Sequence, residues 1–226
     1  NGNELLLVSN RDVALGSGNV IRVPAEANGM ARRQTVLAEQ SLYRTRPDVS
    51  LDGRRFVYSS TSGTADQFNN LYVQPTVGGE PYKLTFFQHD AFHPRWSPDG
   101  ATIAFTAHPQ TGTTVWHNKL YLMPADGSGE PEILLEDFDL NAGAPIWAPN
   151  GADIYWSTGQ GTKTNLFSVQ TATDEVLDHA APRGVNFQFT LSPDGGRWVW
   201  VHSNPSHPSE LYTAPSSDLS QAARLT

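Results

Sequence analysis

The 226-residue chain is acidic, with a formal net charge of −8 and 38% hydrophobic residues. That apolar content allows a buried core and excludes a disordered chain, and the negative balance argues against a nucleic-acid partner, which requires a basic face. The absence of cysteine excludes disulfides, thiolate metal sites and a cysteine nucleophile.

Five copies of a two-part unit follow one another along the chain. The start, "NGNELLLVS", is a shortened first copy, and fuller copies of its part read "VSLDGRRFVYSS" (49–60), "PRWSPDGATIAFT" (94–106), "PIWAPNGADIYWST" (145–158) and "FTLSPDGGRWVWVH" (189–202). A second part such as "KLYLMPADGSGEPEILL", from Lys119, follows each first part. We therefore divide the single domain 1–226 into repeats at about 1–46, 47–91, 92–142, 143–186 and 187–226.

The third repeat shows the four strands that each unit predicts. Strand A ends at Trp96-Ser97, strand B is "TIAFTA", strand C is "KLYLMP" and strand D is "PEILLE". Short β-branched and aromatic runs between Gly, Pro and Asp clusters are typical of strands, and four strands per repeat are typical of propeller blades. Residues 31–44 are weakly helical in composition, but they correspond to strand D of the other copies, so we expect a strand and a loop there.

Pro98-Asp99-Gly100 in this unit has the form of a hairpin turn. It recurs as Asp52-Gly53, Asn150-Gly151 and Asp194-Gly195. Asp or Asn accepts local backbone hydrogen bonds, and Gly adopts the positive φ that such turns need. We therefore expect this turn to have a structural role, and we expect it neither to catalyse a reaction nor to bind calcium. The "PADGSGE" segment (124–130) is read in the same way, as a turn between strands C and D.

The alternation of "WSPDGxxIAF" with "LYxxPADG" resembles the WD40-like PD40 repeat of TolB-like β-propellers and of the propellers in S9 prolyl-oligopeptidase-type peptidases. The resemblance covers the whole chain, with departures at Leu51, Asn150 and the second part of the fourth copy. It implies an all-β propeller of four-stranded antiparallel blades. Five repeats are visible, and the first copy lacks strand A, so either a five-bladed ring closes imperfectly or a sixth blade lies outside this chain. TolB-like propellers are typically six-bladed, and this resemblance favours part of a six-bladed ring.

Candidate binding residues lie where strand D of one blade crosses to strand A of the next. Crossovers lead to the innermost strands, and the mouths of closed β structures are favoured ligand sites. We expect a polar mouth on the face that carries the crossovers and the B–C loops; ordinary hydrated loops are the alternative. The candidates are Arg44, Arg46, His89, Asp90, His93, Arg95, Asn141, Asn186 and Gln188.

No motif in the chain indicates catalysis. There is no Gly-x-Ser-x-Gly, His-Glu-x-x-His or phosphate loop. "HDAFH" (89–93) offers two histidines and an aspartate, but on a loop and not on a helix face, so we expect neither a metal site nor a cofactor. Five tryptophans fall within strands A and B, where blade-to-blade packing explains them.

Two main functions are compatible with these observations, and a further alternative is a propeller enzyme whose mouth holds a metal ion through His89 and His93. The first is a non-catalytic propeller that binds a protein or peptide partner at its mouth, in the periplasm or secreted, with the cytoplasm as the alternative compartment. The second is a substrate-gating propeller of a larger hydrolase, either an S9-type peptidase or a multidomain metallohydrolase, whose catalytic domain lies elsewhere. The sequence opens with Asn1-Gly2-Asn3-Glu4 and not with a signal peptide, so we expect either a mature or trimmed form or a protein that is not exported. No apolar run reaches the ~20 residues that a membrane helix needs.

Overall fold

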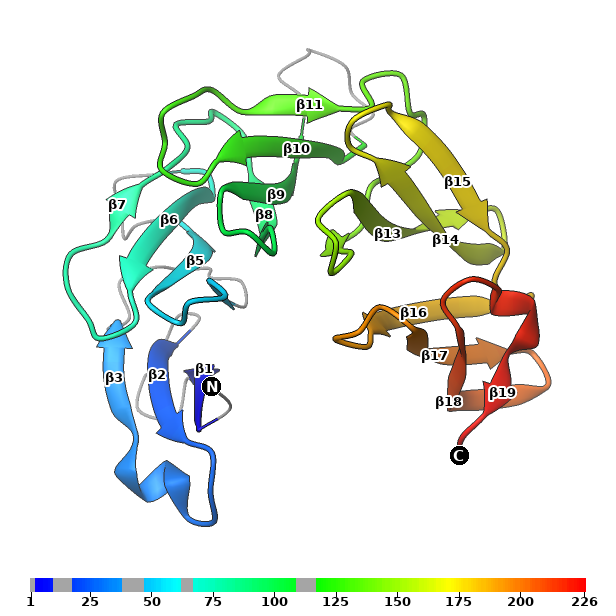
Figure 1. Cartoon of the computed structure of the whole chain (residues 1–226), viewed down its shortest axis with the longest axis horizontal. Helices are drawn as coiled ribbons and strands as arrows, with labels where there is room; N and C mark the ends of the chain where they lie inside the picture. Colours follow the sequence, from blue (N-terminus) through cyan, green and yellow to red (C-terminus); the bar gives the residue numbers. More distant parts are fainter. Residues whose placement is uncertain (1–2, 10–17, 38–46, 62–66, 109–116) are drawn as a thin grey trace. The chain divides into compact units, whose positions relative to one another are not determined.

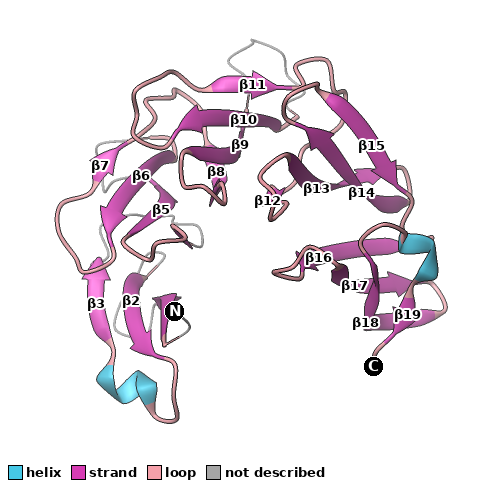
Figure 2. Ribbon diagram, viewed as in Figure 1, coloured by secondary structure: helices cyan, strands magenta, loops and turns pink. Residues whose placement is uncertain are grey.

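A computed structural model describes residues 3–9, 18–37, 47–61, 67–108 and 117–226. Within these ranges the chain is almost entirely β-structure, and its helical elements are two short 3-10 turns, η1 (Gly29–Arg32) and η2 (Leu219–Gln221) (Figure 2). No helix in the described part of the chain is long and apolar enough to span a membrane.

The strands form antiparallel sheets that follow the repeat order (Figure 1). The first contains β1 (Glu4–Ser9), β2 (Asn19–Pro24) and β3 (Gln34–Leu37), and the second contains β4 (Asp48–Val49), β5 (Arg55–Ser60), β6 (Asn70–Pro75) and β7 (Tyr82–Lys83). The third contains β8 (Ala91–Trp96), β9 (Thr102–Ala107), β10 (Lys119–Pro124) and β11 (Glu132–Leu134). The fourth contains β12 (Ile146–Trp147), β13 (Asp153–Gln160), β14 (Lys163–Gln170) and β15 (Glu175–His179). The fifth contains β16 (Val185–Leu191), β17 (Arg197–Asn204), β18 (His207–Pro215) and β19 (Ala223–Arg224).

This architecture confirms the predicted fold class, an all-β propeller of antiparallel blades. The three-stranded first sheet matches the expected lack of strand A in the first copy. Residues 31–44 were expected to form a strand and a loop. In the structure the short turn η1 ends at Arg32, and the strand β3 begins at Gln34. The chain also separates into two compact units: one holds β1–β9, the other holds β12–β19, and β10 and β11 are divided between them.

The turns between strands A and B have the predicted hydrogen-bonded form. In the third sheet Ser97 Oγ donates to Asp99 Oδ1 at 2.5 Å, and the same carboxylate oxygen accepts the N–H of Ala101 at 3.0 Å. These two bonds lower the pKa of Asp99, and Gly100 takes φ +72°. The second and fifth sheets repeat the arrangement around Asp52 and Asp194. The turn is therefore part of the scaffold, as predicted.

Backbone bonds show which connections share an end of a sheet. The A–B turn contacts the C–D turn of its own sheet, as in the bond from Ala125 N to Ala101 O at 2.8 Å. At the opposite end, the crossover into a sheet contacts the start of strand C in the preceding sheet, as in the bond from Ala91 N to Asn69 O at 2.8 Å. The crossovers and B–C loops therefore lie together, on the end away from the Asp-Gly turns.

The core lies between neighbouring sheets. In the first unit Val20 of β2 packs with Phe56 and Tyr58 of β5. In the second unit Trp198 and Trp200 of β17 are fully buried, and Tyr155 of β13 meets Trp198 edge to face with ring centroids 5.0 Å apart. Tryptophan packing between blades, expected from the sequence, is thus seen at Trp198.

Alternation along β17 turns Val199 to the face of the last sheet opposite Trp198. That residue is exposed, as are Val185 of β16 and Leu211 of β18. The last sheet thus buries its aromatic residues and exposes several aliphatic ones.

Candidate functional site at the strand crossovers

Seven of the nine predicted mouth residues fall within the described part of the chain. Arg44 and Arg46 lie outside the described residues. His89 and Asp90 lie on the crossover before β8, His93 and Arg95 lie in β8, Asn141 lies on the crossover before β12, and Asn186 and Gln188 lie in β16. His89 to Arg95 belong to the first compact unit, and the remaining three belong to the second.

Asp90 and Asn141 occupy the same repeat position and make the same contact. Asp90 Oδ1 accepts the backbone N–H of Asn69 at 2.8 Å and its side-chain Nδ2–H at 2.9 Å. Asn141 Oδ1 accepts the backbone N–H of Asn118 at 2.6 Å. Asn69 and Asn118 each immediately precede strand C of the preceding sheet. Each of these two candidate side chains therefore ties a crossover to the neighbouring sheet.

Asn186 is completely buried and makes hydrogen bonds through both ends of its carboxamide. Its Nδ2 donates to the carbonyl oxygens of Pro182 at 2.8 Å and Thr164 at 2.9 Å. Its Oδ1 accepts the indole N–H of Trp200 at 3.0 Å and lies 2.8 Å from Nδ1 of His202. Because Oδ1 can only accept, Nδ1 of His202 carries a proton in this contact.

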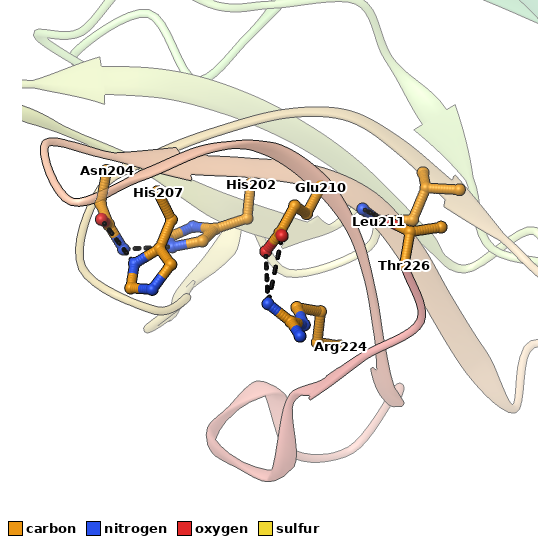
Figure 3. A network of polar contacts seen from close by, with 7 residues as sticks. All are labelled: His202, Asn204, His207, Glu210, Leu211, Arg224 and Thr226. Atoms are coloured by element: carbon orange, nitrogen blue, oxygen red, sulfur yellow. Dashed lines mark hydrogen bonds and ion pairs between the residues drawn. The ribbon is translucent and has the colours of Figure 1, made fainter.

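The polar network continues from His202 into the β17–β18 hairpin (Figure 3). Nε2 of His202 lies 3.4 Å from Asn204 Nδ2, and Asn204 Oδ1 lies 3.3 Å from His207 Nδ1. Further along the same sheet, Glu210 forms an ion pair with Arg224 at 3.1 Å. Burial and the nearby His207 lower the pKa of His202. The network holds the last hairpin and strand together.

His93 and Gln188 share an unusual backbone conformation. Each stands at the register shift of its strand, between Phe92 and Arg95 in β8 and between Phe187 and Thr190 in β16. Their φ angles are +53° and +56°, and both residues are exposed. Bulges of this kind re-aim side chains at functional sites. Although His93 keeps an exposed surface, its Nδ1 lies 3.2 Å from Thr106 Oγ1 in a partly buried contact, and partial desolvation of the ring together with the charge of Arg95 lowers the pKa of His93.

His89 is buried, with 8% of its surface exposed, and its ring stacks on Phe87 with centroids 4.3 Å apart. Neither ring nitrogen has a hydrogen-bond partner among the described residues. Burial lowers its pKa. The described residues contain no group of three or more His, Cys, Asp or Glu that could hold a metal ion.

Asp48 is a site residue that sequence reasoning did not single out. It stands in β4 at the repeat position that Arg95 occupies in β8, and the charge of Arg95 acts on it. Burial raises the pKa of Asp48, although the N–H of Trp96 and the charge of Arg95 oppose the rise. Alignment of the repeats on their turn glycines was the available signal, because it places an acid and a base at matching positions of successive inner strands.

A serine–histidine contact in the fourth sheet is placed for packing and not for catalysis. Ser168 Oγ lies 2.7 Å from Nε2 of His179, the kind of pair that activates a nucleophile in hydrolases. Ser168 is only 5% exposed and lies in the middle of β14, opposite Tyr155 of β13. At that exposure the hydroxyl presents almost no surface to a substrate.

Each compact unit thus presents its own set of polar crossover side chains. In the first unit His93 is exposed and Arg95 is partly exposed, whereas Asp90 makes internal hydrogen bonds. In the second unit Asn141 and Gln188 are exposed, although Asn141 Oδ1 also makes an internal bond, and Asn186 is bonded internally. Donors and acceptors of this kind can hold the backbone or polar side chains of a peptide.

Sequence comparison connects the chain with peptidases. No protein-family profile matches it. It is 25% identical over 147 residues to the uncharacterized peptidase YuxL of Bacillus subtilis, and 23% identical over 134 residues to dipeptidyl-peptidase 5 of Porphyromonas gingivalis. These alignments cover 64% and 56% of this chain, but 22% and 19% of the two relatives. The region they share with this chain is therefore about a fifth of each relative.

Structural comparison gives the fold. The chain superposes over its whole length on a TolB protein of Agrobacterium tumefaciens (TM-score 0.78, 20% identity, 77% of that chain covered) and on TolB of Acinetobacter baumannii (TM-score 0.76, 18% identity, 53% covered). Puromycin hydrolase matches 91% of this chain with a TM-score of 0.68 and 18% identity, over 32% of its own length. The fold is therefore a TolB-like propeller, one that also forms part of a hydrolase.

Proposed function

We propose that this chain is the propeller part of a peptidase-type hydrolase and that it binds peptide substrate at the crossover face. The observation that carries this proposal is that the two curated relatives are both peptidases by name and share only about a fifth of their length with this chain. The match to puromycin hydrolase, again over a fraction of that protein, supports the same assignment. The catalytic residues of such an enzyme would lie on another part of the protein.

The crossover face suits the role of selecting substrates. His93 and Gln188 are exposed at bulges that fix their direction, so their hydrogen-bonding groups are presented without the entropic cost of ordering a loop. The internal bonds of Asp90 and Asn186 keep the backbone beneath them rigid. Within each compact unit, side chains held in this way discriminate among peptides by the hydrogen bonds that each peptide can complete.

A second function remains supported by a specific observation. The TolB structures match the whole of this chain with the higher TM-scores, and this favours a non-catalytic propeller that binds a protein or peptide partner. The periplasmic or secreted location and the six-bladed ring stay predictions. The aliphatic residues exposed on the last sheet, such as Val199 and Leu211, are the surface on which a further blade would pack.

Two measurements test the proposal. Labelled peptides are titrated into the 226-residue chain and followed by fluorescence anisotropy, with His93→Ala and Gln188→Ala expected to weaken binding. Asp126→Asn is the control, because Asp126 lies on an exposed C–D turn at the opposite end of its sheet. Equal binding by all variants would contradict the crossover site.

Peptidase assays on the natural full-length protein test the enzymatic part. Cleavage of peptide substrates by that protein, with altered KM in the same two crossover variants, is the expected result. Peptide binding without cleavage by the full-length protein would instead favour the TolB-like partner-binding function.

A further inference from the structure

One buried position of the repeat carries a different combination of neighbouring side chains in the third, fourth and fifth sheets. Counted from the turn glycine, Ala91, Ala142 and Asn186 are equivalent, and all three are buried. The strand-B residues level with them are Phe105 and Ala107 in the third sheet, Trp156 and Thr158 in the fourth, and Trp200 and His202 in the fifth. The fourth sheet therefore combines polar strand-B groups with an alanine where the fifth has an asparagine.

In the fifth sheet the asparagine satisfies the polar groups beside it. Asn186 Oδ1 accepts the indole N–H of Trp200 at 3.0 Å and the Nδ1–H of His202 at 2.8 Å. In the third sheet Phe105 and Ala107 have no polar side-chain atoms, so Ala91 leaves nothing unpaired. These two sheets are both internally consistent.

The fourth sheet leaves its buried polar groups without such a partner. Trp156 is 1% exposed, and neither its Nε1–H nor the hydroxyl of Thr158 has a hydrogen-bond partner among the described residues. Asn118 Oδ1 is likewise buried and unpaired within the described part of the chain. A buried donor left unpaired costs about as much as its desolvation, so native proteins satisfy such groups with side chains or with ordered water.

A small pocket lies between Asn118 and Trp156, and Thr158 is not part of its lining. Its other lining residues are Lys119, Leu120, Leu134, Leu135, Phe138 and Ala142. The room inside it is that of about one water molecule, and its polar partners meet the requirement of a buried water. Phe138, which meets Trp156 edge to face with centroids 5.3 Å apart, forms part of its wall.

We propose that this pocket is a buried water site. One water molecule accepts the indole N–H of Trp156 and donates to Asn118 Oδ1. For Trp156 it thereby replaces the carboxamide that Asn186 supplies to Trp200 in the next sheet. Solvent makes a bridge in the second compact unit at a position where the fifth sheet uses a side chain.

The first test replaces the water with a side chain. Ala142→Asn places a carboxamide where Asn186 has one, and we expect the melting temperature to rise by about 2–4 °C. Ala91→Asn is the matched control: it buries the same carboxamide beside Phe105 and Ala107, and we expect it to lower the melting temperature. Equal destabilisation by both substitutions would overturn the proposal.

The second test observes the water and does not depend on the stability of any variant. In the unsubstituted chain, the indole proton of Trp156, assigned with Trp156→Phe, should show a nuclear Overhauser contact to a long-lived water. The indole proton of Trp200 should show none, and it should gain one in Asn186→Ala. Absence of the water contact at Trp156 would overturn the proposal.

Discussion

Trp96 and Asp48 are joined by two hydrogen bonds across neighbouring inner strands. The backbone N–H of Trp96 donates to Asp48 Oδ2 at 2.8 Å, and its indole Nε1–H donates to the backbone carbonyl of Asp48 at 3.1 Å. The guanidinium of Arg55 lies over the same indole, 4.9 Å from the ring centroid. An aspartate, a tryptophan and an arginine thus link β4, β5 and β8.

Asp48→Asn should become relatively more stable as the pH rises. Burial raises the pKa of Asp48, so the folded state favours the protonated acid. That contribution to stability is complete below the unfolded-state pKa and is lost as the pH rises through the folded-state pKa. An asparagine can still accept the N–H of Trp96 but does not ionise. We expect the melting temperature of the variant minus that of the original chain to increase between acid and neutral pH.

Asp52→Asn is the control with the opposite sign. Hydrogen bonds from Ser50 and from the N–H of Arg54 lower the pKa of Asp52, so its stabilising contribution is present above the unfolded-state pKa and is lost as the pH falls through the folded-state pKa. Its variant should lose stability at neutral pH and little in acid. The assignment of Asp48 would be wrong if both variants changed in the same direction with pH.

Gly100→Ala should destabilise the chain by about 1 kcal/mol through backbone strain. Gly100 has φ +72°, and an added Cβ would meet no atom within 4 Å, so steric contact makes no contribution. Gly159→Ala in β13 is the matched control, since it also has open space around it but no positive φ. Denaturant unfolding should show a loss for the first substitution only; a similar loss for both would point to a cause other than φ.

Asp90→Ala should lower the free energy of unfolding by about 1–3 kcal/mol, because the backbone and side-chain N–H groups of Asn69 would lose their acceptor. Asp90→Asn should retain most of the stability, because asparagine already performs this role at Asn141. Thermal unfolding of the two variants separates the loss of the acceptor from the loss of the charge. If the asparagine variant were as unstable as the alanine variant, the negative charge would be the important feature.

Acid should weaken the last sheet through His202. Burial and His207 lower the pKa of His202, so the neutral ring is favoured in the folded state. The stability that it contributes is present above about pH 6.5, the unfolded-state value, and is lost as the pH falls through the folded-state pKa. The protection factors of the β17 amides against hydrogen exchange should fall over that range and should fall less in His202→Gln. An equal fall in both proteins would assign the effect to another group.

Most of the fold could be predicted from the sequence because its repeats are recognisable. Aspartate and glycine recur at fixed positions before each strand B, and their φ angles and hydrogen bonds follow directly from the chemistry of those residues. Alignment of the repeats on these turns also predicted that the crossovers lie at the same end of the sheets as the B–C loops. Strand D of the first sheet, at residues 34–37, was found from its repeat position although its composition is weakly helical.

The internal bonding of the candidate site was less accessible. Asp90 and Asn186 are polar residues on or next to crossovers, and sequence cannot distinguish a side chain that faces solvent from one that bonds to the neighbouring sheet. Gln188 and His93 give no sign of a left-handed backbone, because residues other than glycine seldom adopt it. For Asn186 a signal did exist: its equivalents Ala91 and Ala142 are small, as residues at a buried position often are.

The bulges at His93 and Gln188 have a practical consequence for engineering. The same backbone bulge recurs at the same repeat position in two sheets. The main chain therefore sets the direction of the Cα–Cβ bond at this position, whichever residue stands there. A metal-chelating, fluorescent or affinity group grafted at either position would inherit that direction. Each of the two sheets that carry the bulge can therefore serve as a display scaffold with one attachment point whose backbone direction is defined.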